Sequence, residues 1–522
     1  TSANTFATGT VGVKGAGVLT ASAKDGGWEW TRENASALFG SYVGLVYLST
    51  MLGGYFADKV IGYRWAVVLG ACLMTLGHAA MSVETEFSIY LGLILLVFGN
   101  GFFKPNMTSI ISEMYKDRPE KKDGAYTLFY MGVNAGAFFG ILLCGYLGEK
   151  VGWSYGFGLA GIFMFFGMLQ FWLSQSIFGN IGLKPNKESK AIKEAADSDK
   201  RNPFTRIQLG IITFVCTLGL LWILNAPASK ISGGKIDVFR FLGENGNSIA
   251  ILSALVLFIG LLIYRLTHYS QITKEKLMAV TFFAFLSIFF WAIYEQSPNS
   301  MTIFASDYTN RVLEGNWSVA FLIMNSLITI LPLAIITWAL YLLFKQTFKK
   351  YTLASVILSS SFVIVWTIAI WMLAKDYYTA GYLSLSDGVL EFLKIDKVTI
   401  PLTEIPATWV STLSSLFIIL LAPLFSKWWE SKYNPTANYK YGIGMTLLGL
   451  GMASVAFGAQ GIEPGAKTAS VSMIWLVLAS LLHTMGELCI SPVGLSYVSK
   501  LVPARMIAFM FGVWYLAVAI GM

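Results

Sequence analysis

The chain has 522 residues, of which 55% are hydrophobic and only 13% are charged. Soluble domains carry roughly 25% charged residues, so this composition excludes an ordinary soluble protein and indicates one whose surface faces a lipid bilayer. The net charge of +8 does not indicate a nucleic-acid partner, because the basic residues lie in short loops between apolar segments.

Fourteen apolar segments are long enough to cross a bilayer as α-helices, which takes about 20 residues each. In lipid such a segment must be helical, because its backbone groups have no water to bind. In chain order we predict helices over 37–56, 64–82, 87–108, 125–148, 154–177, 207–226, 247–267, 278–297, 317–344, 352–374, 407–429, 440–459, 472–498 and 504–522. The sequence therefore predicts an all-α, multi-pass protein of the cell membrane (the inner or plasma membrane).

The loops between these helices differ in charge when the helices are placed alternately across the bilayer. One side then holds roughly twice as many lysines and arginines as the other, and the basic side of a membrane protein is cytoplasmic. The longest loop on that side, 178–206, is rich in Lys, Asn, Ser, Asp and Glu and is predicted to link two helical bundles.

Metal and enzyme chemistry have no support in the residue pattern. The four cysteines fall within apolar runs, none of them in a CxxC or a Cys/His cluster, and the chain has only three histidines. Neither a nucleophile elbow nor a phosphate-binding loop occurs in the sequence. We therefore expect no metal site and no enzyme.

Lys104 lies inside an apolar helix, in the segment 98–106. A lysine at the centre of a span costs about 2.5–3.5 kcal/mol, so Lys104 is expected to face a partner or a water-filled cavity. The alternative is a side chain that extends to the cytoplasmic surface. Gly99 and Gly101 beside it suit a close approach of helices.

Two glutamates also lie in apolar helices. Glu295 follows Trp291 by one helical turn and shares its face, which makes it a candidate proton carrier. The alternative is a glutamate wetted at the extracytoplasmic end of its helix. Glu487 has many apolar residues on both sides and could neutralise a substrate ammonium group. The alternative is a structural pair with a neighbouring helix.

Four further polar residues stand out. Tyr130 and Asn134 are one turn apart on a face flanked by glycines, which suits either substrate hydrogen bonds or helix packing. Asp58 and Arg64 lie at a helix end and in the loop after it. We expect this pair to determine topology or to act as a conformational latch.

Five segments, in this order, resemble sequence blocks of the proton-dependent oligopeptide transporters, a family of the major facilitator superfamily. They are 53–62, 126–138, 290–296, 416–425 and 486–494. The resemblance spans roughly residues 40 to 522. It implies a major facilitator fold of two six-helix bundles that imports di- and tripeptides together with protons, with no cofactor other than the coupling proton.

The resemblance also implies a set of site residues. Those that would bind substrate are Tyr47, Lys104, Tyr130 and Asn134 in the N-terminal bundle and Trp291, Ser414, Glu487, Ser491 and Trp514 in the C-terminal bundle. Glu487 matches the position expected to hold the amino terminus of the peptide. Glu295 and Lys104 match positions associated with proton coupling and with the peptide carboxylate.

The sequence departs from the family pattern in three places. The family's first helix, with its Glu-x-x-Glu-Arg motif, and its last helix are expected to be absent from this chain. Ser414 and Ser415 stand where the family usually has Asn-Pro. The helices 317–344 and 352–374 and the polar segment after them are outside the usual pattern, and we expect them to pack at the periphery of the bundle or to bind a partner protein.

These features divide the chain into seven parts. They are an extracytoplasmic N-terminal stretch (1–36), an N-terminal bundle (37–177), a linker (178–206), an extra helix pair of the kind found in prokaryotic members (207–275), the first helix of the C-terminal bundle (276–300), an inserted helix pair with an extracytoplasmic segment (301–405) and the rest of the C-terminal bundle (406–522).

The predicted function is a proton-coupled symporter for di- and tripeptides that works by alternating access. A symporter for another small organic anion or a drug is a second hypothesis, because one fold serves many cargoes. A membrane receptor or scaffold that does not transport is the third. The intramembrane charges argue against this third hypothesis.

Overall fold

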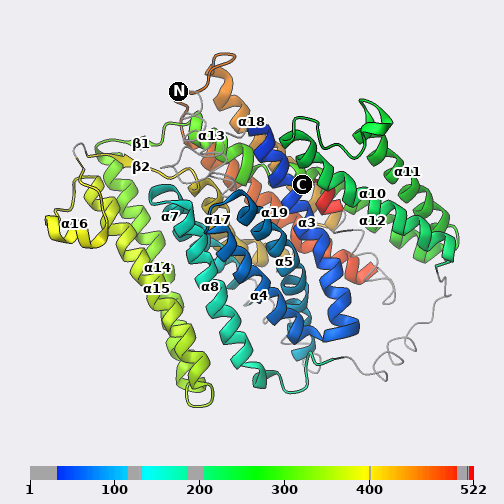
Figure 1. Ribbon diagram of the computed structural model, residues 1–522, viewed down its shortest axis with the longest axis horizontal. Coiled ribbons are helices and arrows are strands. Elements are labelled where there is room, and N and C mark those ends of the chain that lie inside the picture. Colours follow the sequence, from blue (N-terminus) through cyan, green and yellow to red (C-terminus); the bar gives the residue numbers. More distant parts are fainter. Residues whose placement is uncertain are drawn as a thin grey trace.

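The structure is a computed structural model that describes residues 32–115, 129, 132–184, 204–398, 401–501, 514 and 517–521. It is almost entirely helical (Figure 1). The long helices are α3 (Arg32–Phe56), α4 (Tyr63–Met81), α5 (Glu86–Met114), α8 (Trp153–Leu173), α10 (Arg206–Ile231), α11 (Gly246–Leu266), α12 (Gln271–Tyr294), α14 (Asn316–Thr347), α15 (Thr352–Thr379), α17 (Trp409–Glu430), α18 (Ala437–Gly458) and α19 (Ile474–Leu501).

Shorter elements join these helices. The segment 132–139 is helical and continues through a π-helical stretch, Gly140–Gly145, into α7 (Tyr146–Lys150). Another π-helical stretch, Ser297–Met301, leads from α12 to α13 (Thr302–Asp307). Two short strands, β1 (Val312–Leu313) and β2 (Thr403–Glu404), pair antiparallel, and α16 (Asp387–Leu393) lies between α15 and β2.

Twelve helices in the described part of the chain are long and apolar enough to cross a bilayer. They coincide with twelve of the fourteen predicted spans, so the chain is a multi-pass membrane protein. The other two spans, 125–148 and 504–522, fall partly outside the described residues, and their described parts are helical or π-helical. The helix predicted over 37–56 extends in the described part of the chain to Arg32, and Ala35 in this extension is buried against α4 and α5. Residues 271–275, assigned to the extra helix pair, belong to α12.

The N-terminal bundle packs α3 against α5, and α4 against both α5 and α8. The predicted close approach of helices at two glycines of α5 is confirmed. A Cβ at Gly99 would lie 2.5 Å from Cγ of Met74, and one at Gly101 would lie 2.6 Å from the carbonyl oxygen of Ser49. Only glycine allows the three helices to approach this closely, and their contact positions the middle of α5.

The C-terminal bundle packs α12, α17 and α18 against α19. Its core includes Phe290, Tyr441, Leu448 and Leu488. A Cβ at Gly486 would lie 2.8 Å from the carbonyl oxygen of Gly444, so α18 and α19 touch along their backbones one residue before Glu487.

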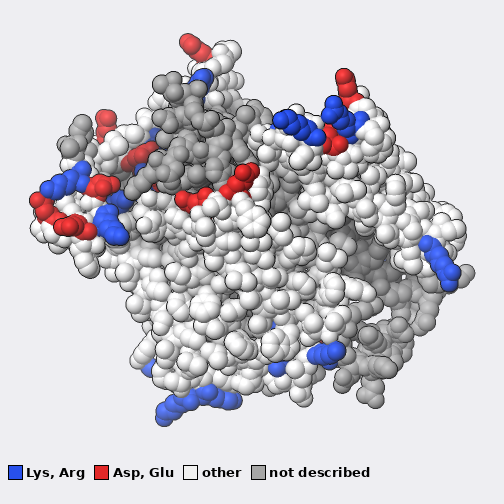
Figure 2. Space-filling model, viewed as in Figure 1, with Lys and Arg blue, Asp and Glu red and all other residues white. Residues whose placement is uncertain are grey.

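The two additional helix pairs lie at opposite edges of the molecule (Figure 1). The pair α10–α11 packs against α3, and the pair α14–α15 packs against α8 of the N-terminal bundle. The inserted helices are therefore at the periphery of the bundle, which is one of the two predicted arrangements. In Figure 2 the charged side chains along the lower edge are basic, whereas the upper part carries both acidic and basic ones. The positive-inside rule places the lower side in the cytoplasm.

Candidate functional site

Lys104 of α5 lies well inside its helix and has an accessible side chain. Its Nζ lies 4.5 Å from the centre of the Tyr47 ring, a cation–π contact with α3. It also interacts electrostatically with Glu295 at the end of α12. The lysine therefore faces the C-terminal bundle instead of extending to the cytoplasmic surface. Between these two described residues no ion pair within 4.0 Å forms, so Glu295 and Lys104 are near each other without touching.

Glu295 is the residue at which the regular hydrogen bonding of α12 ends. Its backbone N–H donates to the carbonyl of Trp291 at 3.0 Å, and the chain then continues into the π-helical stretch. Its carboxylate interacts electrostatically with Lys104 and with Glu487. A carboxylate that interacts with both a cation and a second carboxylate is a group whose protonation changes the charge balance of the whole site.

Glu487 of α19 accepts a hydrogen bond from the hydroxyl of Tyr294 at 2.5 Å. The Tyr294 ring stacks on Phe290, with 5.6 Å between the ring centres, and Phe290 is fully buried. The carboxylate is thus oriented by a phenol whose own position is determined by core packing. The sequence motif around Glu295 contains Tyr294, but its role as the partner of Glu487 was missed, because the two residues are almost two hundred positions apart.

Aromatic side chains of both bundles enclose this group of charges. Tyr47 of α3 and Trp291 of α12 lie 6.3 Å apart between ring centres, and Trp291 meets Tyr294 edge-on at 5.6 Å. Trp514 is buried in the same hydrophobic cluster. Six of the predicted residues are therefore close to one another: Tyr47, Lys104, Trp291, Glu295, Glu487 and Trp514.

The remaining predicted substrate residues are Ser491, Ser414, Asn134 and Tyr130. Ser491 lies one turn beyond Glu487, and its buried Oγ has no hydrogen-bond partner among the described residues. Ser414 contacts α19 through its backbone, whose carbonyl accepts from the Thr484 hydroxyl at 3.5 Å. Asn134 is buried in the segment 132–139. Tyr130 lies outside the described residues, so its role stays a prediction.

Arg64 connects parts of one bundle. Its side chain donates to the carbonyl oxygens of Ile181 and Gly179, both at 2.5 Å, and its guanidinium lies 5.6 Å from the centre of the Phe178 ring. These contacts fasten the beginning of α4 to the chain that follows α8. The side chain of Asp58 lies outside the described part, and the predicted latch between the two remains a prediction.

The arrangement defines a class of protein. Two helical bundles meet at intramembrane charges of opposite sign, one cation in the N-terminal bundle and two carboxylates in the C-terminal bundle. Substrate sites at the interface between two bundles are typical of secondary membrane transporters. The described residues contain no group of His, Cys, Asp and Glu that could hold a metal ion.

The chain belongs to the POT family, whose profile matches residues 64–377 and 395–522. The peptide transporter YePEPT of Yersinia enterocolitica is 28% identical over 517 residues, which cover 96% of this chain and 80% of that protein. A di-/tripeptide transporter of Lactococcus lactis subsp. cremoris is 26% identical over 490 residues, or 93% of this chain and 78% of that one.

Solved structures share the fold. A crystal structure of the peptide transporter POT in complex with sulfate is 24% identical and superposes with a TM-score of 0.64, covering 99% of this chain and 84% of that one. An in meso crystal structure of the POT family transporter PepTSo gives 0.58 at 18% identity, with 99% and 85% covered. The predicted fold and family are confirmed.

Proposed function

We propose that this protein is a proton-coupled symporter that imports di- and tripeptides by alternating access. The observation that supports this most is the position of Lys104 and Glu487 in different bundles. Glu295 interacts electrostatically with both of these residues. Charges of opposite sign suit the two ends of a zwitterionic peptide. The names of the two relatives above, both transporters of peptides, support the same substrate class.

Glu295 would couple the proton to the peptide. In its charged form it attracts Lys104 across the interface between the bundles, and a bound proton removes that attraction. Because rocking of the bundles requires this interface to change, protonation would shift the balance between the two conformations. The proton gradient would then drive peptide accumulation.

The assignment of Glu487 is tested with purified protein in liposomes. We expect Glu487→Gln to weaken uptake of a labelled free-amino dipeptide by about tenfold or more, the loss of one charge-assisted contact. Glu463→Gln is the matched control, since Glu463 is exposed in a loop. Unchanged affinity in Glu487→Gln would overturn the assignment, provided that the variant elutes as a folded protein.

The assignment of Glu295 is tested by separating gradient-driven uptake from exchange. We expect Glu295→Gln to lose accumulation driven by an inward proton gradient and to keep counterflow of labelled against unlabelled peptide. Accumulation at the wild-type level would contradict a coupling role.

The same liposomes distinguish the two other hypotheses. If the wild type takes up no labelled dipeptide but accumulates labelled organic anions or drugs in a proton gradient, the protein carries another cargo. A complete lack of substrate-dependent proton flux in the wild type would indicate a receptor or scaffold.

A further inference from the structure

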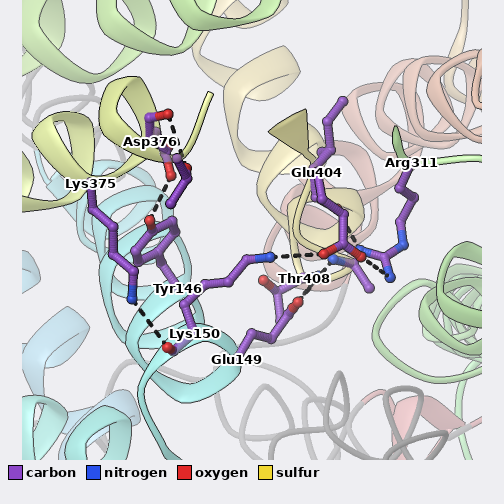
Figure 3. Close-up of polar contacts among 11 residues, drawn as sticks. Tyr146, Glu149, Lys150, Arg311, Lys375, Asp376, Glu404 and Thr408 are labelled. Atoms are coloured by element: carbon purple, nitrogen blue, oxygen red, sulfur yellow. Dashed lines mark hydrogen bonds and ion pairs between the residues drawn. The ribbon is translucent and has the colours of Figure 1, made fainter. Parts of the chain in front are cut away.

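A second group of charges lies on the extracytoplasmic side, between the end of α7 and the beginning of α17 (Figure 3). The carboxylate of Glu149 accepts hydrogen bonds from the backbone N–H groups of Ala407 at 3.2 Å and Thr408 at 2.8 Å. Thr408 is the N-cap of α17, but its side chain makes no capping bond, and the first turn of α17 has no acidic residue. The N-terminus of a helix needs acceptors for its free N–H groups. In this protein the N-terminal bundle supplies that acceptor to a helix of the C-terminal bundle.

The next residue of α7 makes a second connection. Lys150 Nζ lies 3.0 Å from Glu404 Oε2, and Arg311 lies 2.8 Å from Glu404 Oε1 (Figure 3). Arg311 also donates to the carbonyl of Ile405 at 2.6 Å. Burial by itself would raise the pKa of Glu404, but Lys150 and Arg311 outweigh that effect and hold the pKa below its ordinary value. The glutamate is therefore charged at neutral pH.

Glu404 is held in place by its own part of the chain. It belongs to β2 and pairs with Val312 of β1, next to Arg311. The two strands flank the inserted helices, and β2 leads into α17. The ion pair between Glu404 and Lys150 thus connects the segment before α17 with the N-terminal bundle. Replacing Lys150 leaves the pairing of β1 with β2 and the ion pair between Arg311 and Glu404 intact.

The inserted helices themselves are attached to the N-terminal bundle. Asp376 of α15 accepts from the hydroxyl of Tyr146 at 2.6 Å and from Nδ2 of Asn325 at 3.0 Å. Lys375 donates to the carbonyl of Lys150 at 3.2 Å, at the end of α7. Tyr146 and Asn325 are both buried, so separating them from Asp376 would leave polar groups without water.

The connection through Lys150 is different, because water reaches it. The side chains of Lys150 and Glu404 are 27% and 32% exposed. When such a pair separates, water replaces the lost contact, and the free-energy difference is small. The ion pair between Lys150 and Glu404 can therefore open and close reversibly.

We propose that Glu149 and Lys150, together with Glu404 and the N-terminus of α17, form an extracytoplasmic gate that must separate before peptide can enter. We call these groups the clasp. The inference rests on the proposed alternating access, in which the contacts on one side of the site break to open that side. The conformation described here has the clasp closed.

The clasp is tested by the reactivity of one introduced cysteine. Ser36 of α3 donates to Oδ1 of Asn299 at 3.1 Å, a further contact between the bundles. In a chain whose Cys72, Cys144, Cys216 and Cys489 are replaced by alanine, Ser36→Cys is labelled from the outside of intact cells with a membrane-impermeant maleimide. Reagent reaches this position more readily when the two bundles move apart on that side.

We expect Lys150→Met and Glu149→Gln each to raise the labelling rate about two- to fivefold, the effect of losing one partly exposed charged contact. Lys150→Arg should label at the wild-type rate. Lys397→Met is the matched control, because its ion pair with Asp387 lies in the same inserted segment and is largely exposed, at 68% and 79%. If Glu149→Gln does not fold, Lys150→Met still decides the question.

Wild-type labelling rates in both Lys150→Met and Glu149→Gln, or an equal rise in Lys397→Met, would overturn the clasp. The labelling requires no substrate. A wild-type protein that takes up no peptide would contradict the proposed function and leave this measurement valid, so the two failures are distinguishable.

Discussion

Tyr294 joins the aromatic and the acidic parts of the candidate site. Its ring stacks on Phe290, and its hydroxyl donates to Glu487, a residue of another helix. A carboxylate held by one defined hydrogen bond has fewer orientations to lose when a ligand binds. Among the described residues near Glu487, Tyr294 is therefore the one we expect to prepare it for a substrate amino group.

We expect Tyr294→Phe to weaken binding of free-amino dipeptides by about tenfold, because a hydrogen bond to a charged group contributes roughly 1.5–3 kcal/mol. Binding is measured by competition of labelled uptake. Tyr441→Phe is the control with the same chemical change, since the Tyr441 hydroxyl lies 3.4 Å from Ser287 in the same bundle and forms no hydrogen bond with Glu487, which the structure also describes. Equal affinities of the two variants would show that Tyr294 only fills space.

At the scale of the helices, glycines determine how closely α3 and α5 approach. A Cβ at Gly53 would lie 2.0 Å from the carbonyl oxygen of Gly101, whereas a Cβ at the neighbouring Gly54 would meet no atom within 4 Å. The contact is a direct backbone approach between α3, which contains Tyr47, and α5, which contains Lys104. The cation–π contact between these two side chains depends on that spacing.

We predict that Gly53→Ala lowers the stability of the protein, because overpacking at a close contact typically costs about 1–3 kcal/mol. Gly54→Ala should be neutral or stabilising by up to about 1 kcal/mol, since alanine favours a helix more than glycine does. Thermal unfolding of the two variants in detergent compares them directly. A midpoint for Gly53→Ala equal to that of Gly54→Ala would mean that the helices shift apart without penalty.

At the scale of the whole molecule, the inserted pair α14–α15 contacts both bundles. It packs against α8 of the N-terminal bundle, while Phe321 of α14 lies 5.4 Å from Trp409 of α17 between ring centres, and β2 leads into α17. A rigid-body movement of the bundles must therefore separate the pair from one of them. The buried contacts of Asp376 indicate that the pair moves with the N-terminal bundle.

Cross-linking tests this assignment. With Lys150→Cys and Glu404→Cys joined by a short bifunctional thiol reagent, we expect peptide uptake to stop, because the bundles can no longer part. With Tyr146→Cys and Asp376→Cys joined in the same way, uptake should match that of the same variant before cross-linking. Inhibition by the second cross-link and not by the first would show that the inserted pair moves with the C-terminal bundle.

Much of this protein could be predicted from the sequence because the signals are local. The length of each apolar run identified the membrane spans, and the charge of the loops indicated their orientation. Lys104, Glu295 and Glu487 stood out because charged residues are rare within the apolar run of a membrane-spanning helix. The five family segments, two of which contain Glu295 and Glu487, also predicted the family correctly.

The pairing of these charges was decided by the tertiary structure alone. Tyr294 meets Glu487, and Glu149 meets the N-terminus of α17, across separations of almost two hundred and more than two hundred and fifty residues. The docking of α14–α15 on α8 is likewise unpredictable from the sequence, because an apolar helix surface fits lipid and protein equally well. Hydrophobicity determines which segments lie in the membrane, whereas only close packing and hydrogen-bond geometry determine which of them touch.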